Sequence, residues 1–348
     1  MADIKFETKT VSAFIRNPLQ NFAVSEEKIQ IRKDPLTGNQ MRLISPKGLD
    51  KLPSGTPLQD FVANAESCFF CEGRVESQTP LLPENIHPEG RIGIGSALLF
   101  PNLAGFARYS GVCILSKKHY TAIQDFTAQE IRDGLLACRE FFRVCAATDS
   151  DVLYPSVNMN YLLPAGSSIL HPHLQPVLDP FPTNNHLQML QGSGKYMQEN
   201  NSSYWTDLIS QERGKERFIL DSENMVLLAP FAPTGFNEVN LILKESGNFA
   251  EFPETMLEEI GTILQQIFRI YHHLQHNSFN LAIFSPPVNR SAEIKPMPCV
   301  LKICTRPTFT GFYRNDITFF ERFHGESMLD RAPEAVAEDF RLFIAGRK

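Results

Sequence analysis

Near the middle of the chain stands the segment Gly166-Ser167-Ser168-Ile169-Leu170-His171-Pro172-His173-Leu174-Gln175. Alternate side chains of an extended strand point to the same face, so His171, His173 and Gln175 are predicted to share one face. A lone buried histidine is usually a packed core residue, but two imidazoles and an amide at this spacing are hard to explain by packing. We therefore expect a site in which an imidazole binds a metal, transfers a proton or attacks an electrophile.

A metal site is indicated by two cysteines upstream of this segment. Cys68 and Cys71 form a Cys-x-x-Cys pair, and His119 follows an apolar run. With one histidine of the later pair they supply two thiolates and two imidazoles, a ligand set that suits tetrahedral zinc. Four protein ligands leave no open position for water, so such a zinc is expected to be structural. The remaining histidine is then free to act as a nucleophile.

The His-Pro-His-x-Gln segment resembles the active-site strand of the galactose-1-phosphate uridylyltransferase family, in the histidine-triad superfamily. The likeness extends from Arg32-Lys33-Asp34-Pro35-Leu36-Thr37-Gly38 to about residue 330. The resemblance implies that zinc is the cofactor, that His173 is the nucleophile, and that Gln175 hydrogen-bonds the phosphoryl oxygens. It implies four zinc ligands, which are Cys68, Cys71, His119 and His171. The other residues that it places at the nucleotide are Ser167, Ser168, Asn160 and Asn102. Lys47 and Lys51 are the nearest candidates for the basic side chains that the family brings to the phosphates, where usual members have arginines, and the alternative is that both are solvated surface lysines.

The chemistry that the resemblance implies is nucleotidyl transfer. His173 attacks the α-phosphorus of a nucleotide sugar, sugar 1-phosphate leaves, and a second phosphate attacks the nucleotidyl-histidine. Transfer of UMP between UDP-glucose and a hexose 1-phosphate, in galactose metabolism, is the expected reaction. An adenylyltransferase, or a phosphorylase of ADP-sugars or dinucleotides, stays open because Leu103 stands where uridylyltransferases have an aspartate after Asn102. A non-catalytic nucleotide-binding protein, or a zinc-stabilised interaction protein, is the third possibility.

The second half of the chain repeats the plan of the first. At one constant offset, residues 239–245 match residues 113–119 and Phe252 matches Phe126. At the same offset, a predicted helix over 254–273 matches the helix that is predicted after Thr127. Further on, residues 302–307 correspond to residues 171–176. We expect an α+β fold of two histidine-triad-like domains, each an antiparallel sheet with packed helices, of which only the first keeps the chemistry. They span residues 1–195 and 196–348, with the boundary in the polar residues 191–203.

Two local patterns are clear. Residues 28–46 are predicted to form a strand, a turn and a strand, because Ile29 and Ile31 alternate with polar residues before the turn-forming residues 34–39. Thr127 and Glu130 have the spacing of a helix capping box.

Several departures from the family concern the substrate. A second metal site that some members carry is expected to be absent, because residues 302–306 and 184–190 lack the matching ligands. Gly325 is followed by Glu326 and Ser327, where the family has a tyrosine and a glutamate, so the acceptor sugar is expected to differ. The remaining histidines of the second half are predicted to lie at the surface; they are His272, His273, His276 and His324.

Composition excludes several classes of protein. The 348 residues carry a net charge of −6 with no block of lysine or arginine, which argues against nucleic acid as a partner. The N-terminus lacks the apolar core of a signal peptide, no run is long enough for a membrane span, and the seven cysteines do not form a disulfide pattern. We therefore expect a cytoplasmic enzyme, and the resemblance implies a homodimer acting on a nucleotide sugar and a sugar 1-phosphate.

Overall fold

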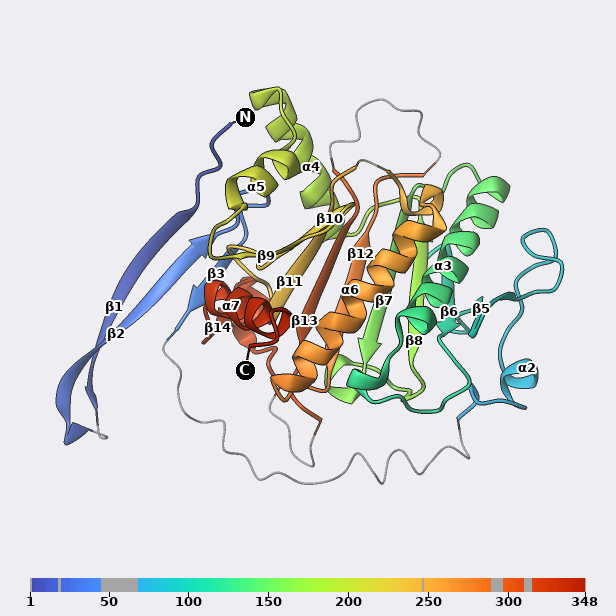
Figure 1. Ribbon diagram of the computed structural model, residues 1–348, viewed down its shortest axis with the longest axis horizontal. Coiled ribbons are helices and arrows are strands. Elements are labelled where there is room, and N and C mark those ends of the chain that lie inside the picture. The colour runs from blue at the N-terminus through green and yellow to red at the C-terminus, as the bar shows by residue number, and fades with distance from the viewer. Residues whose placement is uncertain are drawn as a thin grey trace.

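The computed structural model describes residues 2–17, 20–44, 68–245, 247–288, 297–309 and 315–347. They form an α+β fold, as predicted, in which a large antiparallel sheet is covered on one face by two long helices, α3 (Ala128–Thr148) and α6 (Glu254–His273) (Figure 1). The other long helices are α4 (Asn184–Asn200), α5 (Tyr204–Glu212) and α7 (Pro333–Ile344). Among these residues, no helix combines the length and the apolar character that a bilayer span requires. Shorter helical turns are α2 (Val75–Gln78), η3 (Ile123–Asp125), η4 (Leu163–Ala165), η5 (Phe249–Glu251) and η6 (Phe320–His324).

The large sheet has ten strands in the order β4-β5-β6-β8-β7-β12-β13-β11-β10-β9. From one end to the centre the order is β4-β5-β6-β8-β7, and from the other end it is β9-β10-β11-β13-β12, so the strands of each half follow the same order relative to the chain. The two halves meet where β7 pairs with β12. We call this central pairing the seam. The strands are β4 (Ile92–Ile94), β5 (Ala97–Pro101), β6 (Tyr109–Ile114), β7 (Tyr154–Tyr161), β8 (His173–Asp179), β9 (Phe218–Asp221), β10 (Met225–Leu228), β11 (Phe236–Leu243), β12 (Phe279–Phe284) and β13 (Val300–Thr305).

The two faces of this sheet differ in polarity. In β7, Val157, Met159 and Tyr161 are buried in the core that α3 and α6 cover, whereas Asn158 and Asn160 alternate with them and are half-buried. The period-two pattern therefore sends amides to the face that is not covered by α3 and α6, which we call the open face. This polar row positions the candidate site.

The helices on the covered face follow the sequence signals closely. Thr127 and Glu130 form the predicted capping box, with each side chain bonded to the other residue's backbone N–H. α3 and α6 pack closely at Gly261, where an added Cβ would lie 2.7 Å from the carbonyl oxygen of Ala128. Glycine at this position therefore allows the close approach of the two helices.

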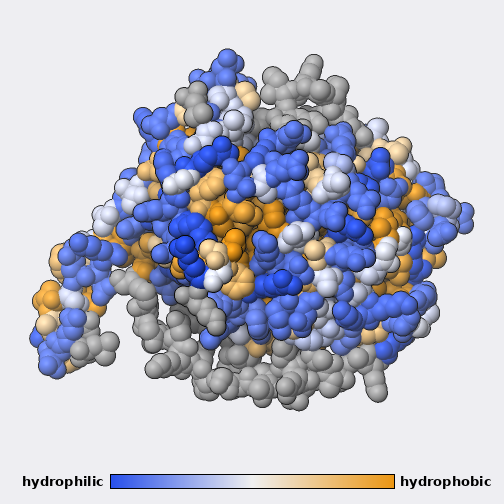
Figure 2. All heavy atoms as spheres, viewed as in Figure 1, coloured by the Kyte–Doolittle hydropathy of each residue, from blue (hydrophilic) through white to orange (hydrophobic). Residues whose placement is uncertain are grey.

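A smaller sheet has the order β1-β2-β3-β14, with strands β1 (Glu7–Asn17), β2 (Ala23–Lys33), β3 (Gln40–Leu43) and β14 (Ser327–Leu329). The predicted strand, turn and strand over 28–46 corresponds to the end of β2, a turn and β3. β1 was not predicted; it pairs with β2 to form an arm that projects from the molecule (Figure 1). Exposed apolar side chains lie along this arm (Figure 2), namely Val11, Phe14, Ile15, Phe22 and Val24.

The residues at the predicted domain boundary are helical. Most of the polar residues 191–203 lie in α4, which runs to Asn200 and ends at Asn201 in the left-handed conformation. α4 and α5 pack against each other beside the second half of the large sheet (Figure 1). The division into residues 1–195 and 196–348 stays a prediction.

Candidate active site and metal site

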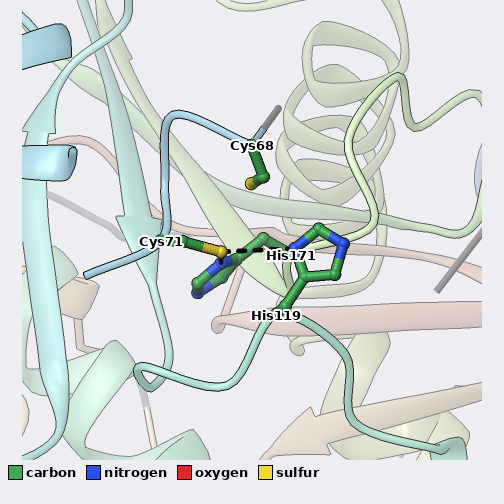
Figure 3. A group of neighbouring side chains, drawn as sticks. All are labelled: Cys68, Cys71, His119 and His171. Carbon is green, nitrogen blue, oxygen red and sulfur yellow. Dashed lines mark hydrogen bonds between the residues drawn. The ribbon is translucent and has the colours of Figure 1, made fainter. Parts of the chain in front are cut away.

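Four predicted metal ligands come together from three separate segments. Cys68 and Cys71 lie on the loop before α2, His119 follows β6, and His171 precedes β8 (Figure 3). Their ligand atoms all lie within 4.8 Å of one another. The Sγ of Cys71 is 3.4 Å from His119 Nδ1 and 3.8 Å from His171 Nδ1. Two sulfurs and two ring nitrogens in this arrangement could bind a metal such as zinc.

Hydrogen bonding fixes which nitrogen of His171 faces the cysteines. Its Nε2 is 2.7 Å from the carbonyl oxygen of Ser116, which can only accept, so Nε2 carries the proton and Nδ1 keeps its lone pair. Burial lowers the pKa of His171 to about 4, and burial with the nearby Arg74 cation lowers the pKa of His119. Both rings are therefore neutral at pH 7, as metal ligands must be.

The predicted nucleophile is held by its metal-site neighbour. His173 is 8% exposed, and its Nδ1 donates to the backbone carbonyl oxygen of His171 at 2.8 Å. The proton is thereby fixed on Nδ1, and Nε2 is left as the nucleophilic nitrogen. Burial lowers the pKa of His173, which keeps the ring neutral. The prediction of one strand through both histidines was wrong, since β8 begins at His173 and His171 precedes it.

The loop that carries the cysteines also packs against the nucleophile. Phe70 stands between the two cysteines in the sequence, and its side chain is buried. The centroid of its ring is 5.4 Å from that of His173 and 6.2 Å from that of His171, and both ring pairs are edge to face. Folding of the metal loop therefore limits the positions that the His173 ring can take.

A chain of hydrogen bonds across the seam orients Asn160. Asn280 Nδ2 donates to Asn160 Oδ1 at 2.7 Å and to the Ala165 carbonyl at 2.9 Å, while Arg306 donates to Asn280 Oδ1 at 2.6 Å. A carbonyl can only accept and a guanidinium can only donate, so the Asn280 amide has one possible orientation. Asn160 must then present its oxygen to Asn280, which turns its Nδ2 donor away from the seam.

Arg306 is itself held in place. Its Nε lies 2.8 Å and its Nη2 2.5 Å from the two carboxylate oxygens of Asp316, in the bidentate geometry that guanidinium favours. Sequence reasoning matched Arg306 to Gln175 without giving it a role, and it missed Asn280 and Asp316. Asn280 follows Ser278 at the same spacing as Asn158 follows Ser156. This repeated Ser-x-Asn spacing was the signal that could have identified Asn280.

The other predicted substrate residues lie apart from this chain of hydrogen bonds. Gln175 is half-buried and pairs in register with Asn158 on β7. Ser167 is buried in a turn and donates to the Ile169 carbonyl, whereas Ser168 is exposed.

Asn102 follows β5, two strands from β8, and accepts from the backbone N–H of Ala104; its neighbour Leu103 is 86% exposed. Lys47 and Lys51 lie outside the described residues. The roles of all these residues stay predictions.

The chain is a relative of galactose-1-phosphate uridylyltransferase-like proteins of the histidine-triad superfamily, and it shares their fold. By sequence, it is 25% identical over 291 residues to ADP-glucose phosphorylase of Arabidopsis thaliana (76% of this chain, 81% of the relative). It is 28% identical over 133 residues to galactose-1-phosphate uridylyltransferase of Saccharomyces cerevisiae (37% of this chain, 36% of the relative). An uncharacterised protein of Archaeoglobus fulgidus is 29% identical over 319 residues (91% of this chain, 93% of the relative).

Solved structures show the same fold. The structure of Arabidopsis thaliana ADP-glucose phosphorylase with bound ADP-glucose matches with a TM-score of 0.69 at 22% identity, covering 90% of this chain and 98% of that one. A uridylyltransferase structure matches with a TM-score of 0.68 at 18% identity, covering 92% and 99%. No protein-family model matches the chain. The comparisons place the chain among nucleotidyltransferases and phosphorylases without deciding between them.

Proposed function

We propose that the chain is an enzyme that transfers a nucleoside monophosphate from a nucleotide sugar through a covalent nucleotidyl-His173. The observation that carries this proposal is the Nδ1 hydrogen bond to the His171 carbonyl, which leaves a neutral Nε2 as the attacking atom.

The reaction has two balanced displacements. In the first, the Nε2 lone pair forms a bond to the α-phosphorus, and the bond from phosphorus to the departing sugar phosphate breaks. In the second, an oxygen of the acceptor phosphate attacks phosphorus and the N–P bond breaks, which returns the ring to its neutral form. During the intermediate the ring carries positive charge, which the His171 carbonyl stabilises through the Nδ1 proton. Asn160 Nδ2 and Gln175 are the proposed donors to the phosphoryl oxygens.

The metal has a structural role in this proposal. Zinc bound by Cys68, Cys71, His119 and His171 would hold the metal loop and the His171 backbone in place. Neither the ligand set nor the Nε2 bond of His171 leaves a group free to contact phosphate, so the transfer steps belong to the residues of β7 and β8.

The base is proposed to be adenine, although the resemblance first suggested UMP. Leu103 offers no carboxylate to a base, and the likeness to ADP-glucose phosphorylase covers about twice as much of the chain as the likeness to the yeast uridylyltransferase. A UDP-glucose:hexose-1-phosphate uridylyltransferase remains the second candidate, supported by the shared His-Pro-His-x-Gln segment. The acceptor is either a sugar 1-phosphate or inorganic phosphate.

We also infer that the chain is a duplication. The repeated strand order on the two sides of the seam supports it, as does the packing of α3 against α6. Lys302 and Cys304 stand in the second copy at the places of His171 and His173, so only the first copy can form the adduct. A homodimer, which the resemblance implies, stays a prediction.

The decisive experiment is intact-protein mass spectrometry after mixing the enzyme with ADP-glucose or UDP-glucose in separate neutral solutions. An added AMP that is absent in His173→Ala and present in the exposed control His324→Ala is the expected result. A UMP adduct alone would favour the uridylyltransferase. An adduct that persists in His173→Ala would refute the assignment of the nucleophile.

A further inference from the structure

A separate cavity lies over the second half of the sheet. Its volume is about 360 Å³, which is within the range of small-molecule sites, about 300 to 1,000 Å³. The floor is formed by the open face of β7, β12, β13 and β11, and the walls come from α4, α5, the turn after β2 and residues 228–232. Asn158 and Asn160 line its edge, but His173 and Gln175 do not, so the cavity adjoins the candidate active site without containing its nucleophile.

Carboxylates outnumber cations in the lining of this cavity, with Asp34, Glu212 and Glu238 against Lys302 and Arg217. Lys302 Nζ is 3.1 Å from Glu238 Oε1, and Glu238 is 3% exposed. Arg217 lies 2.6 Å from Glu212 and 3.2 Å from Glu334. Since each cation of the lining is paired with a carboxylate, the cavity has no surplus of positive charge for a phosphate. The charge of the lining therefore disfavours an anionic ligand.

Polar groups on the floor and one wall still have hydrogen bonds to make. Glu212 is 1% exposed, and its Oε2 has no partner among the described residues. A buried carboxylate oxygen without a donor is costly, at about 1–3 kcal/mol or more. Glu212 lines the cavity, so a rotation of its carboxylate toward the cavity would let a ligand O–H or N–H supply the missing donor. Asn158 donates both amide protons, to Ser156 and to the Gln175 carbonyl, which leaves its oxygen to accept. Lys302 has three protons to donate, and Glu238 accepts one of them in the ion pair between the two residues.

The upper walls are apolar and aromatic. Phe6, Trp205 and Phe231 line them, and the Arg217 guanidinium lies over the rings of Phe6 and Phe231 at 4.5 and 5.0 Å. These contacts hold the rings in fixed positions. The cavity therefore offers flat apolar surfaces on one side, and hydrogen-bond acceptors beside an ammonium on the other.

We propose that this cavity binds an uncharged, hexose-sized polyol. A ring with several hydroxyls can donate to Glu212 and Asn158 and accept from Lys302, since each hydroxyl does both. Its C–H faces match the aromatic walls. A phosphate ester would meet Glu212 and Glu238, and an aliphatic ligand would leave the Glu212 oxygen without a donor.

The position of the cavity explains why it binds without reacting. Lys302 and Cys304 occupy the places that His171 and His173 hold in the first half, and both line the cavity. Burial raises the pKa of Cys304 to about 12, so its thiol is not a nucleophile at pH 7. The second half has thus kept a concave face while losing the reactive imidazole.

Trp205 makes this proposal directly measurable. It is the one tryptophan of the 348 residues and lines the cavity, so intrinsic fluorescence reports on this site alone. We would titrate the full-length protein with D-glucose, D-galactose, D-mannose and myo-inositol, and separately with adenosine and uridine. A saturable change with at least one of the polyols, and none with the nucleosides, is the expected result.

Two variants separate binding in the cavity from non-specific quenching. Ala282 lies on the floor, so Ala282→Leu fills the space and is expected to weaken binding at least 10-fold. Glu212→Gln replaces the unpartnered oxygen with an amide donor and is expected to weaken binding about 10-fold, while its remaining oxygen still accepts from Arg217. Lys195→Ala, on the exposed side of α4, is the matched control and is expected to bind as wild type. Thermal melts check that each variant is folded.

The outcomes decide the proposal without reference to the nucleotidyl adduct. No saturable change with any polyol would overturn it, as would a change that Ala282→Leu leaves intact. Saturation by a nucleoside instead would overturn the ligand class. Because adduct formation at His173 is followed separately by mass, failure of the proposed function and failure of this site can be told apart.

Discussion

Because Asn280 orients Asn160 across the seam, a substitution at Asn280 is expected to turn the Asn160 amide so that its oxygen and nitrogen exchange places. In Asn280→Asp the side chain is almost unchanged in shape but has lost its donor. The introduced carboxylate would still accept from Arg306, but it would face two acceptors, the Ala165 carbonyl and Asn160 Oδ1, within 2.9 Å of the original nitrogen. The Asn160 amide is then expected to rotate, so that Nδ2 donates to this carboxylate and Oδ1 faces the phosphate.

The magnitude follows from the bond that is lost. A hydrogen bond to a charged group contributes about 1.5–3 kcal/mol, so its loss in the transition state slows the first displacement about 10- to 150-fold. Asn280→Ala removes the orienting donor without supplying a competing acceptor. Asn160 is then free to rotate but is not reversed, and the loss is about 1 kcal/mol, or roughly 5-fold.

The assay is the single-turnover rate of adduct formation at His173, followed by intact mass with the preferred donor. The order of the two variants is the test, because the aspartate variant must be slower than the alanine variant. If Asn280 served packing alone, the larger truncation to alanine would be the more harmful change. A slower alanine variant, or equal rates in wild type and both variants, would refute the reasoning.

Three further predictions concern stability. Cys71→Ser is expected to release about one equivalent of zinc, measured by elemental analysis, and to lower the Tm by roughly 10 °C, because loss of a few kcal/mol shifts a large domain by about 2–4 °C per kcal/mol; an unchanged metal content would contradict the site. Burial lowers the pKa of His276 from 6.5 to about 4, so its contribution to stability is complete above pH 6.5 and is lost as the pH falls to 4. His276→Gln, which keeps an acceptor for Asn237, should therefore lose about 3 kcal/mol less than wild type between pH 7 and pH 4 in urea titrations; parallel losses would disprove it. Gly261→Ala should cost about 1–3 kcal/mol because its Cβ meets the Ala128 carbonyl, whereas Gly194→Ala, with open space around it, should be neutral or stabilising by calorimetry.

The parts of the structure that sequence predicted well depend on local pattern or on residue chemistry. The capping box at Thr127 needs two residues three positions apart, and the helix over 254–273 was predicted because that segment matches the first helix at one constant offset. The metal group was predicted because cysteine pairs and histidines have few other reasons to occur at such spacings. None of these signals depends on knowing which distant strands pair with each other.

The parts that sequence did not predict depend on long-range pairing. Asn280 reaches Asn160 because β12 pairs with β7 in one register, which joins residues 120 positions apart. His276 was expected at the surface, but it is half-buried and accepts from Asn237, a contact made by tertiary packing. β1 was missed because its apolar residues do not alternate regularly with polar ones, since Ala13, Phe14 and Ile15 are consecutive.

The seam also sets the order of events during synthesis. β7 and β8, with the nucleophile, are complete when residue 179 has been made, but the strand that pairs with β7 at the seam ends at residue 284. Until then β7 has an open edge, and the apolar surface of α3 that will contact α6 is uncovered. The nascent first half is therefore expected to need protection from aggregation. Because Asn160 is oriented only after β12 has docked and Arg306 has followed, catalytic competence is acquired late, when nearly the whole chain has been made.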